Sequence, residues 1–576
     1  MKTIINKSYL IIFIIAAIFV ISCINIDRNN PDDPKAGNFK APALSAVQQL
    51  SFGDRDFDED QISGTLKFSV PLDEVGILEY RIYWGSTATD KLNGENVIAT
   101  FTADGSDKNF TFSDNTPVPG GAEYLLVYSS GEYGESSVPV SMEIKDRVVK
   151  MVKDIVTGTT GTFPSFMTAV GDKLLFTASG SNGIELYVSD GNESGTYEVK
   201  NINSSGDAFN SSPGPGEWMV NYNGTLYFSA NDGTGGGYVL WKSDGTEINT
   251  EKVQTSGTIA SSIKYMTVCN NTLFFQGTNV GDIELWSTNG TNGGTSMITD
   301  LNVNGSSNPR YLVAAGNTLY FTANFDDNIL ARGYELGKSD GTPDGTDIVS
   351  DLVFGATGSN PDYLTAVGSV VFFEANAGTT YGSELYKSPG FSQFIELVKD
   401  INPNSSNSNP NNLTDLNGTL MFTATDSNGN QLWKSNGTDG GTTRLSDSLD
   451  SQTAYLTVAG KYLYFRGRDG EGGKELWRSD GTVDGTVMVK NINDGGDAWP
   501  IHLKGFGDLL FFQATDGING KELWISDGTE GGTFMAKDIF PLGDSAPMNF
   551  EPVGDKLFFS AAHPDYGREL WVYYEK

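Results

Sequence analysis

The chain has 576 residues, of which 38% are hydrophobic and 11% aromatic, so it contains enough apolar material for several buried cores. Its 72 acidic and 38 basic residues give a net charge of −34, which argues against a nucleic-acid partner because such proteins need a basic surface. With only two His and two Cys, the chain has almost no material for His-ligated metal centres, four-cysteine zinc sites or Cys–His nucleophiles.

The N-terminal residues indicate export. Lys2 and Lys7 precede an apolar run from Leu10 to Ile21 that is too short to span a bilayer and is typical of a secretory signal. The sequence Val-Ile-Ser-Cys ending at Cys23 resembles the bacterial lipobox. This resemblance implies that residues 1–22 are a lipoprotein signal peptide and that Cys23 carries fatty acyl chains such as palmitate. An ordinary cleaved signal with an incidental cysteine is the alternative.

A lipidated Cys23 would anchor the protein to a membrane, because each buried methylene contributes about 0.8 kcal/mol. Cys269 would then have no disulfide partner within the chain. Residues 23–40 are polar, contain two prolines and show no apolar periodicity, so we expect a flexible tether. The expected location is the cell envelope, as an outer-membrane lipoprotein that is either surface-exposed or periplasmic.

Residues 41–147 read as a small antiparallel β-sandwich. Short runs of alternating apolar and polar residues, separated by turn residues, predict strands at 62–70, 78–86, 95–103, 108–114, 122–130 and 137–144. The segment with Tyr80, Tyr83 and Trp84 resembles the third strand of a fibronectin type III-like domain.

An acidic segment lies near the start of the predicted sandwich, with Asp54, Asp56, Asp58 and Asp60 at alternate positions. It lacks the turn glycine and the closing glutamate of an EF-hand loop, since Glu59 and Thr65 occupy those positions. We therefore expect a solvated acidic loop.

Residues 148–576 repeat one motif. The phrase Glu-Leu-Trp and its variants occur nine times, with the third residue at Tyr187, Trp241, Trp286, Gly337, Tyr386, Trp433, Trp477, Trp524 and Trp571. The mean period is (571 − 187)/8, or 48 residues, and every segment is of β type. A period of this length in an all-β sequence predicts the blades of a β-propeller.

Each repeat predicts four strands. In the first repeat they begin at about Pro164, Lys173, Ile184 and Thr196. The first two strands of every repeat are joined by two residues that include Gly or Asn, as in primed β-hairpin turns. The turn between the third and fourth strands reads Ser-Asp-Gly-Thr and resembles the Asp-box hairpin of sialidase-like propellers, which implies a structural brace at Asp244, Asp340, Asp480 and Asp527.

The two ends of the repeat region complement each other. It opens at residues 151–155 with a fourth-type strand and closes with a third-type strand. Pairing of these strands would close a single ring of nine blades without exposed edges. Two smaller rings, or eight blades with one irregular unit, are the alternatives.

The repeat is similar to the ELWxxDGT repeat of bacterial surface and secreted proteins, a family with no common assigned activity. The fourth and fifth copies depart from it, because Gly337 replaces the aromatic residue and Pro389-Gly390 replaces Asp-Gly.

A candidate ligand site lies at the start of the first strands, which line the axis of a propeller. The aligned residues there are Phe166, Trp218, Tyr265, Tyr311, Tyr363, Asn412, Tyr455, His502 and Asn549. Aromatic rings offer an apolar face and a polar edge, so this set could stack a sugar or clasp a peptide. The alternative is that these side chains pack between the sheets as core.

Acidic loops are expected on the same face, with Asp207, Asp497 and Asp544, and with Asp326 beside Asp327. Calcium is conceivable there, but no loop repeats a full ligand set, so no metal or other cofactor is expected.

Catalysis finds little support in the sequence, because His502 and His563 lie in separate repeats and no hydrolase or nucleotide-binding motif occurs. We therefore expect a protein that is not an enzyme: a membrane-anchored module that binds a protein or glycan through its propeller. A carbohydrate-active enzyme and a structural envelope protein are the alternatives.

Overall fold

The computed structural model describes residues 47–576 except 72–73, 133, 211–218, 254–260, 280, 292, 379, 390–393, 447–448, 450–452 and 469–472. The predicted signal peptide 1–22, the predicted lipidation site Cys23 and the predicted tether 23–40 therefore lie outside the described residues. The described chain is all β and divides into two compact units. Unit 1 runs to Asp56 and continues over Asp60–Asp146, and unit 2 comprises Phe57–Glu59 and Arg147–Lys576. No helix in the described part is long and apolar enough to cross a membrane.

Unit 1 contains two antiparallel sheets, and all six strands predicted for it are present. Its strands are β1 (Gln49–Ser51), β2 (Gln61–Ser69), β3 (Glu79–Gly85), β4 (Ala99–Thr102), β5 (Lys108–Pro117), β6 (Tyr124–Gly131), β7 (Gly134–Glu135) and β8 (Val140–Glu143). One sheet has the order β1-β2-β5, and the other has the order β4-β3-β6-β7 with β8 also paired to β6. Alternate residues of both sheets, such as Leu66, Ile82 and Val127, form one apolar cluster.

The prediction of a solvated acidic loop at residues 54–60 is wrong for two of its carboxylates. Asp54 and Asp56 are only 3% and 7% exposed. Asp54 accepts hydrogen bonds from the backbone N–H groups of Asp56 and Ser63, and Asp56 accepts one from Asn115. Burial is possible because these N–H donors replace water around the charge.

Unit 2 repeats a four-stranded antiparallel sheet nine times within the described residues. The first strands are β10 (Ser165–Val170), β14 (Val220–Tyr222), β18 (Ser261–Cys269), β22 (Arg310–Ala315), β26 (Asp362–Val367), β30 (Asn411–Leu416), β34 (Ala454–Ala459), β38 (Ile501–Phe506) and β42 (Met548–Val553). The second strands are β11 (Lys173–Gly180), β15 (Thr225–Ala230), β19 (Thr272–Asn279), β23 (Thr318–Asp326), β27 (Val370–Asn376), β31 (Thr419–Asp426), β35 (Tyr462–Gly467), β39 (Leu509–Ala514) and β43 (Lys556–His563).

The third strands carry the Glu-Leu-Trp phrase. They are β12 (Gly183–Ser189), β16 (Val239–Ser243), β20 (Asp282–Thr288), β24 (Ala331–Ser339), β28 (Ser383–Pro389), β32 (Gly429–Ser435), β36 (Glu475–Ser479), β40 (Glu522–Ser526) and β44 (Gly567–Glu575). The fourth strands are β13 (Tyr197–Lys200), β17 (Glu251–Lys252), β21 (Thr295–Thr299), β25 (Asp347–Ile348), β29 (Glu396–Lys399), β33 (Thr443–Arg444), β37 (Val487–Lys490), β41 (Thr533–Lys537) and β9 (Arg147–Lys153). A bridge between Val239 and Ser261 joins the second and third sheets.

The hairpin between the first and second strands has the predicted two-residue form. The first residue of each pair has a positive φ, from 45° at Asn270 to 62° at Gly171, which Gly and Asn tolerate at low cost. The short turn fixes the register, so that the apolar residues of each strand face a neighbouring sheet.

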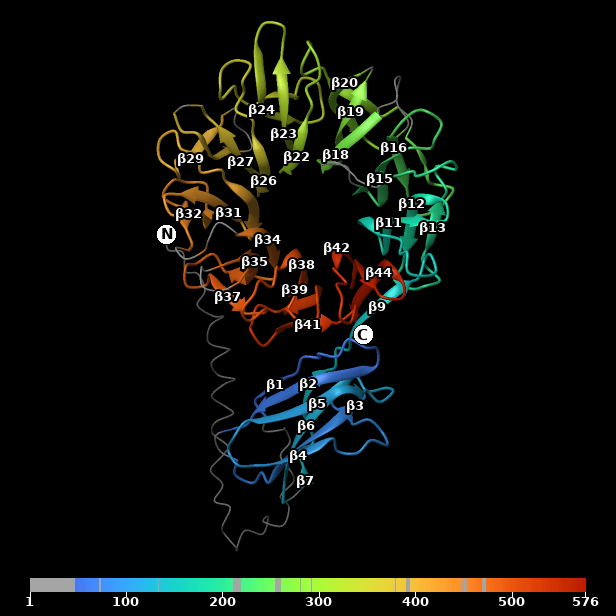
Figure 1. Ribbon diagram of the computed structural model, residues 1–576. Helices are drawn as coiled ribbons and strands as arrows, with labels where there is room; N and C mark the ends of the chain where they lie inside the picture. Colours follow the sequence, from blue (N-terminus) through green and yellow to red (C-terminus); the bar gives the residue numbers. More distant parts are fainter. Residues whose placement is uncertain are drawn as a thin grey trace, which may run out of the picture. The chain divides into compact units, whose positions relative to one another are not determined.

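Neighbouring sheets pack face to face through apolar clusters. Phe372 and Leu385 of one sheet meet Leu420, Phe422 and Trp433 of the next. Each first strand also lies next to the first strand of the following sheet, and β42 lies next to β10. Figure 1 shows the sheets of unit 2 following one another around a centre, with the first strands innermost and the fourth strands outermost.

The two ends of the repeat region meet in one sheet, as predicted. Strand β9 pairs with β44, with Met151 opposite Trp571 and Val149 opposite Tyr573. The last sheet therefore takes its fourth strand from the beginning of the repeat region. Its side chains join those of the first sheet in one apolar cluster that includes Val152, Phe176 and Leu570.

The irregular fourth repeat keeps its strand pairing. Gly337 lies opposite Phe321 in the ladder of β23 and β24. A Cβ atom at Gly337 would lie 2.6 Å from the Phe321 ring and 2.8 Å from the ring of Phe325. Phe325, which is 4% exposed, thus packs against the position where other repeats carry an aromatic residue.

Candidate functional site

Among the described residues, the inner ends of seven sheets begin with an unusual backbone segment, which we call the entrance motif. It is a four-residue segment whose first and fourth residues both have a positive φ without being glycine. The segments are 163–166, 262–265, 308–311, 360–363, 409–412, 499–502 and 546–549. In each, the ladder between the first and second strands is interrupted by a bulge directly after the strand begins. Bulges of this kind redirect a side chain.

Five of the ligand residues proposed from the sequence occupy the fourth position of this motif, and Tyr455 lies at the equivalent position of its own sheet. Their φ values are 48° at Phe166, 55° at Tyr265, 54° at Tyr311, 54° at Tyr363, 63° at Tyr455 and 54° at His502. Trp218 lies outside the described residues. Positive φ is strained for an aromatic residue, and such strain persists only where the surrounding structure imposes it.

These six side chains do not pack as core, which was the alternative. Phe166 and Tyr265 are partly exposed, and the other four are exposed. Tyr311, Tyr363 and Tyr455 are 37%, 49% and 46% exposed. The rings of Tyr265 and Tyr311, from adjacent sheets, lie 6.2 Å apart in an edge-to-face arrangement. The structure therefore brings these two together and leaves aromatic surface accessible.

The two asparagines at the same position hold the scaffold. The Asn549 amide donates a hydrogen bond of 3.1 Å to the carbonyl of Pro164, which links the last sheet to the first. Asn412 donates to the hydroxyl of Thr423 in its own sheet at 3.2 Å.

The third residue of the motif and its partner on the second strand vary strongly in charge. The pairs are Ser165 with Thr177, Lys264 with Gln276, Arg310 with Thr322, Asp362 with Glu374, Asn411 with Thr423, Ala454 with Arg466, Ile501 with Gln513, and Met548 with Ser560. The backbone at the inner face is thus nearly uniform, whereas the side chains differ from sheet to sheet.

A buried carboxylate holds the loop in front of the entrance motif. The glutamates of the Glu-Leu-Trp phrase, here called the clamp glutamates, are at most 1% exposed; they are Glu185, Glu284, Glu335, Glu384, Glu475, Glu522 and Glu569. Glu384 accepts hydrogen bonds from the N–H and hydroxyl of Ser408 at 3.1 and 2.6 Å, and from the N–H of Ile401 at 2.9 Å. Ser408 directly precedes the motif at 409–412. The clamp thereby fixes the strained backbone.

The clamp glutamates have unusual acidity. Desolvation by burial raises the pKa of Glu185, Glu284, Glu335, Glu384, Glu475 and Glu569 to about 7, although their hydrogen bonds act in the opposite direction. The sequence analysis used this glutamate only to align the repeats. Its recurrence within an apolar strand was the signal that could have revealed a buried clamp.

The predicted structural role of the aspartates in the outer turns is confirmed. The Asp340 carboxylate accepts hydrogen bonds from the N–H and the hydroxyl of Thr342, two residues further along the chain. Asp244, Asp480 and Asp527 each accept the same pair of hydrogen bonds from the threonine two residues after them. Beside them, Ser339 and Thr346 pair their hydroxyls at 2.7 Å. These contacts close the turn from within.

The aspartates of the acidic loops, which were considered as calcium ligands, also accept hydrogen bonds from backbone N–H groups. Asp207, Asp497 and Asp544 each accept the N–H at or next to the start of a third strand, at 2.9–3.0 Å. Asp326 and Asp327 accept N–H groups of the residues that follow them.

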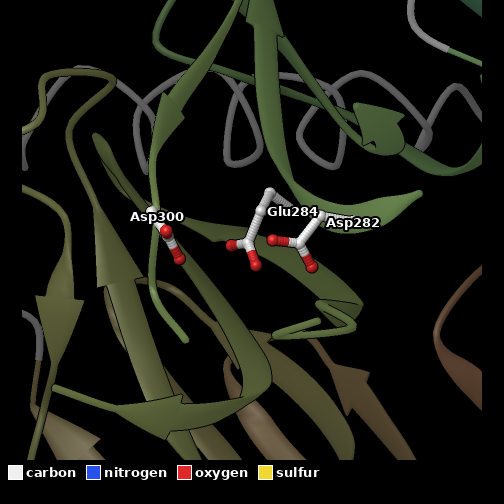
Figure 2. A group of neighbouring side chains, drawn as sticks. All are labelled: Asp282, Glu284 and Asp300. Atoms are coloured by element: carbon white, nitrogen blue, oxygen red, sulfur yellow. The ribbon is translucent and has the colours of Figure 1, made fainter. Parts of the chain in front are cut away.

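One acidic group in the described residues has its oxygens close enough to hold a cation. Figure 2 shows Asp282 and Glu284 on one strand and Asp300 on a neighbouring segment, with ligand oxygens within 4.8 Å of one another. Both Glu284 oxygens already accept hydrogen bonds, from Ser307 and from Leu301. We assign no ion to this group.

No family model and no curated protein matches the chain. Solved structures that resemble it include a mutant puromycin hydrolase complexed with PGG, at 12% identity and a TM-score of 0.34 over 63% of this chain and 60% of that one. A puromycin-hydrolyzing peptidase of Mycobacterium tuberculosis matches at 10% identity and a TM-score of 0.37, over 72% of this chain and 60% of that one. TolB from Acinetobacter baumannii matches at 10% and 0.24, over 62% and 84%.

These neighbours correct one expectation. From the sequence we expected a protein that is not an enzyme. Because the solved structures that resemble this chain include hydrolases and peptidases, that expectation is withdrawn. The chain spans 60% of the length of the first puromycin hydrolase. At 10–12% identity and TM-scores below 0.5, the likenesses give this chain no activity or ligand of its own.

Proposed function

We propose that this protein is an exported lipoprotein, anchored through Cys23, whose unit 2 is a single nine-bladed propeller that binds a protein or glycan at its inner face. The sandwich acts as a fibronectin type III-like spacer. The proposal of one ring is supported by the pairing of β9 with β44 and by the serial contacts of the first strands. It is supported further by the hydrogen bond from Asn549 to Pro164.

The observation that carries the binding role is the entrance motif. Its backbone is strained in at least seven sheets, is held by buried glutamates, and presents exposed aromatic rings together with side chains of varied charge. Strain that is maintained in a repeated way at an accessible face is typical of ligand sites. A surface needed only for packing would bury these rings.

The test of binding uses the full mature chain against arrays of glycans and envelope or host proteins. The double variant Tyr363→Ala/Tyr455→Ala is compared with Tyr197→Ala, which removes a tyrosine of similar exposure from the outer strand β13. Loss of a captured ligand in the double variant alone supports the proposal. Equal binding by the wild type and the double variant contradicts it.

The anchor has a separate test. The Cys23→Ala variant is expected to leave the membrane fraction, because the acyl chains would be absent. Retention in membranes would remove the lipoprotein assignment. Protease treatment of intact cells then separates the two locations: loss of unit 2 with a periplasmic control intact indicates the surface, and protection indicates the periplasm.

A further inference from the structure

One cavity at the inner face is cationic although the protein is strongly acidic. It has a volume of about 520 Å³ and lies between the third and fourth sheets of unit 2. Its polar lining consists of Ser262, Lys264, Tyr265, Gln276, Asn308, Arg310 and Tyr334. Ligand pockets for small molecules commonly have volumes of about 300–1,000 Å³. The cavity therefore suits one or two sugar rings or a short peptide segment.

Arg310, the arginine of this cavity, lies beside two tyrosine rings. Its guanidinium lies 4.5 Å from the ring centre of Tyr334 and 5.5 Å from that of Tyr311. The Nε atom is buried and has no hydrogen-bond partner in the described part of the chain. No ion pair involving Arg310 occurs among the described residues. Two rings thus orient a planar cation whose hydrogen-bonding capacity is not fully used by the protein.

The rest of the lining offers the complementary groups. Lys264 adds a second positive charge to the cavity wall. Tyr265 and Tyr334 supply aromatic surface, and Gln276 and Asn308 supply amides. The Gln276 amide nitrogen donates to the carbonyl of Pro309, which orients its oxygen as an acceptor. Carboxylate recognition by a bidentate arginine, ring stacking by tyrosine and hydroxyl recognition by amides are together suited to an acidic sugar.

The total charge restricts the ligand further. At −34, the protein repels a long polyanion such as a nucleic acid or a highly sulfated chain. A single carboxylate on an otherwise neutral chain incurs little of this repulsion but still gains the contact with Arg310. The next sheet places Asp362 and Glu374 at the equivalent positions, which disfavours a second negative charge nearby.

We propose that this cavity binds a carboxylate-bearing sugar residue, such as a uronic acid, within an otherwise neutral glycan, with Arg310 holding the carboxylate and Tyr265 or Tyr334 stacking on the ring. The proposal rests on the binding function given above and names its ligand class.

The experiment measures binding of the full mature chain to a xylo-oligosaccharide carrying one glucuronic acid, by calorimetry. Its carboxyl-reduced form, in which an uncharged hydroxymethyl group replaces the carboxylate, is the matched ligand. Binding of the acidic form is expected to be at least about tenfold tighter, because a charge-assisted contact is lost in the reduced form. The Arg310→Gln variant is expected to bind the acidic form about tenfold more weakly than the wild type and to discriminate the two ligands no longer.

The matched control is Arg478→Gln. Arg478, on the third strand β36, also lies over an aromatic ring, 4.2 Å from the ring centre of Tyr462, and its Nε likewise lacks a hydrogen-bond partner in the described part of the chain, but it belongs neither to this cavity nor to the entrance motif. This variant is expected to bind the acidic sugar as the wild type does. Melting curves of both variants exclude unfolding as the cause of any loss.

The outcomes separate this inference from the broader function. Equal binding of the acidic and reduced sugars, or undiminished binding by Arg310→Gln, overturns the acidic-sugar site while leaving a binding role intact. Capture of an acidic peptide without any binding of the sugar also overturns it. Failure of the wild type to bind any member of the protein and glycan arrays would instead remove the proposed function itself.

Discussion

The outer turns and the entrance motif both recur in unit 2, but the outer turns share their side chains whereas the entrance motifs share their backbone conformation. In the outer turns the side chains themselves recur: a Ser or Thr hydroxyl pairs with a Thr hydroxyl seven residues later, as at Ser189 with Thr196 and Ser526 with Thr533. In the entrance motif the backbone recurs, whereas its third residue is Lys264, Arg310 or Asp362 in successive sheets. Recurring side chains indicate a structural task, and varied side chains on a fixed backbone indicate recognition.

The strongest test of the scaffold is its closure. Deleting residues 148–156 removes β9 and the buried Val148, Val149 and Val152, each of which contributes about 2 kcal/mol by burial. The free energy of unfolding is expected to fall by at least about 5 kcal/mol in urea denaturation. A deletion of nine residues within the predicted tether 23–40, leaving Cys23 in place, is the control, and equal stability of the two deletion proteins would argue against the ring.

The next largest loss of stability is expected when a clamp glutamate is removed. Glu335→Ala would leave the N–H and hydroxyl of the buried Ser359 without their acceptor. We expect a loss of about 2–4 kcal/mol, since each unsatisfied buried group costs about 1–3 kcal/mol. Glu396→Ala, on the exposed side of β29, is the control and should change stability by less than about 0.5 kcal/mol. A Gln is expected to be tolerated, because Gln431 occupies this position in one sheet.

The clamps also predict an unusual pH dependence. Their folded-state pKa of about 7 exceeds the ordinary value of 4.5, so between these values the folded state binds more protons than the unfolded state. The contribution of these glutamates to the free energy of unfolding is therefore greatest below about pH 4.5–5 and decreases as the pH rises to 7. We expect a melting temperature several degrees higher at pH 5.5 than at pH 8, with a smaller difference when Glu335 and Glu384 are replaced by Gln. A melting temperature that rises with pH over this range would contradict the prediction.

A smaller loss of stability is expected from a substitution in the irregular fourth sheet. Gly337→Trp restores the repeat sequence but should destabilise the protein by about 1–3 kcal/mol, because the new side chain would overlap the rings of Phe321 and Phe325. Combined with Phe325→Ala, the same change should be much less harmful. Additive losses in thermal unfolding would show that Phe325 does not occupy the place of the missing aromatic residue.

The smallest effect on stability is expected at the entrance. Tyr363 is about half exposed, so Tyr363→Ala should lower the free energy of unfolding by less than about 1 kcal/mol, although the residue belongs to the proposed ligand face. A loss as large as that of Glu335→Ala would mean that the entrance side chains serve the scaffold, and the contrast between the two regions would disappear.

Much of the fold could be read from short-range patterns. The period of the Glu-Leu-Trp phrase and the Gly or Asn turns specify the four strands of each sheet, and the unmatched strand at the start of the repeats predicted its pairing with β44. The error at Asp54 and Asp56 arose because their N–H donors include Ser63 and Asn115, up to 59 residues away. Charge runs alone do not reveal such partners.

The site was only partly predictable, for a similar reason. Alignment of the repeats gave the positions of Tyr311, Tyr363 and Tyr455, but no propensity assigns a positive φ to tyrosine. The cavity around Arg310 was missed because its walls come from strands of two sheets and a loop between them, and only the folded chain brings these together.

The pairing of β9 with β44 has a consequence for biosynthesis. A ribosome makes β9 long before β44, and almost all of the repeat region lies between the two strands. Until β44 has been made, β9 lacks the strand with which it pairs and the first sheet lacks the neighbour against which Phe176 packs. A prematurely terminated chain would therefore keep an open strand edge and apolar surface exposed, which are features that promote aggregation and degradation. In this architecture the last sheet can be completed only after synthesis of the repeat region has reached β44.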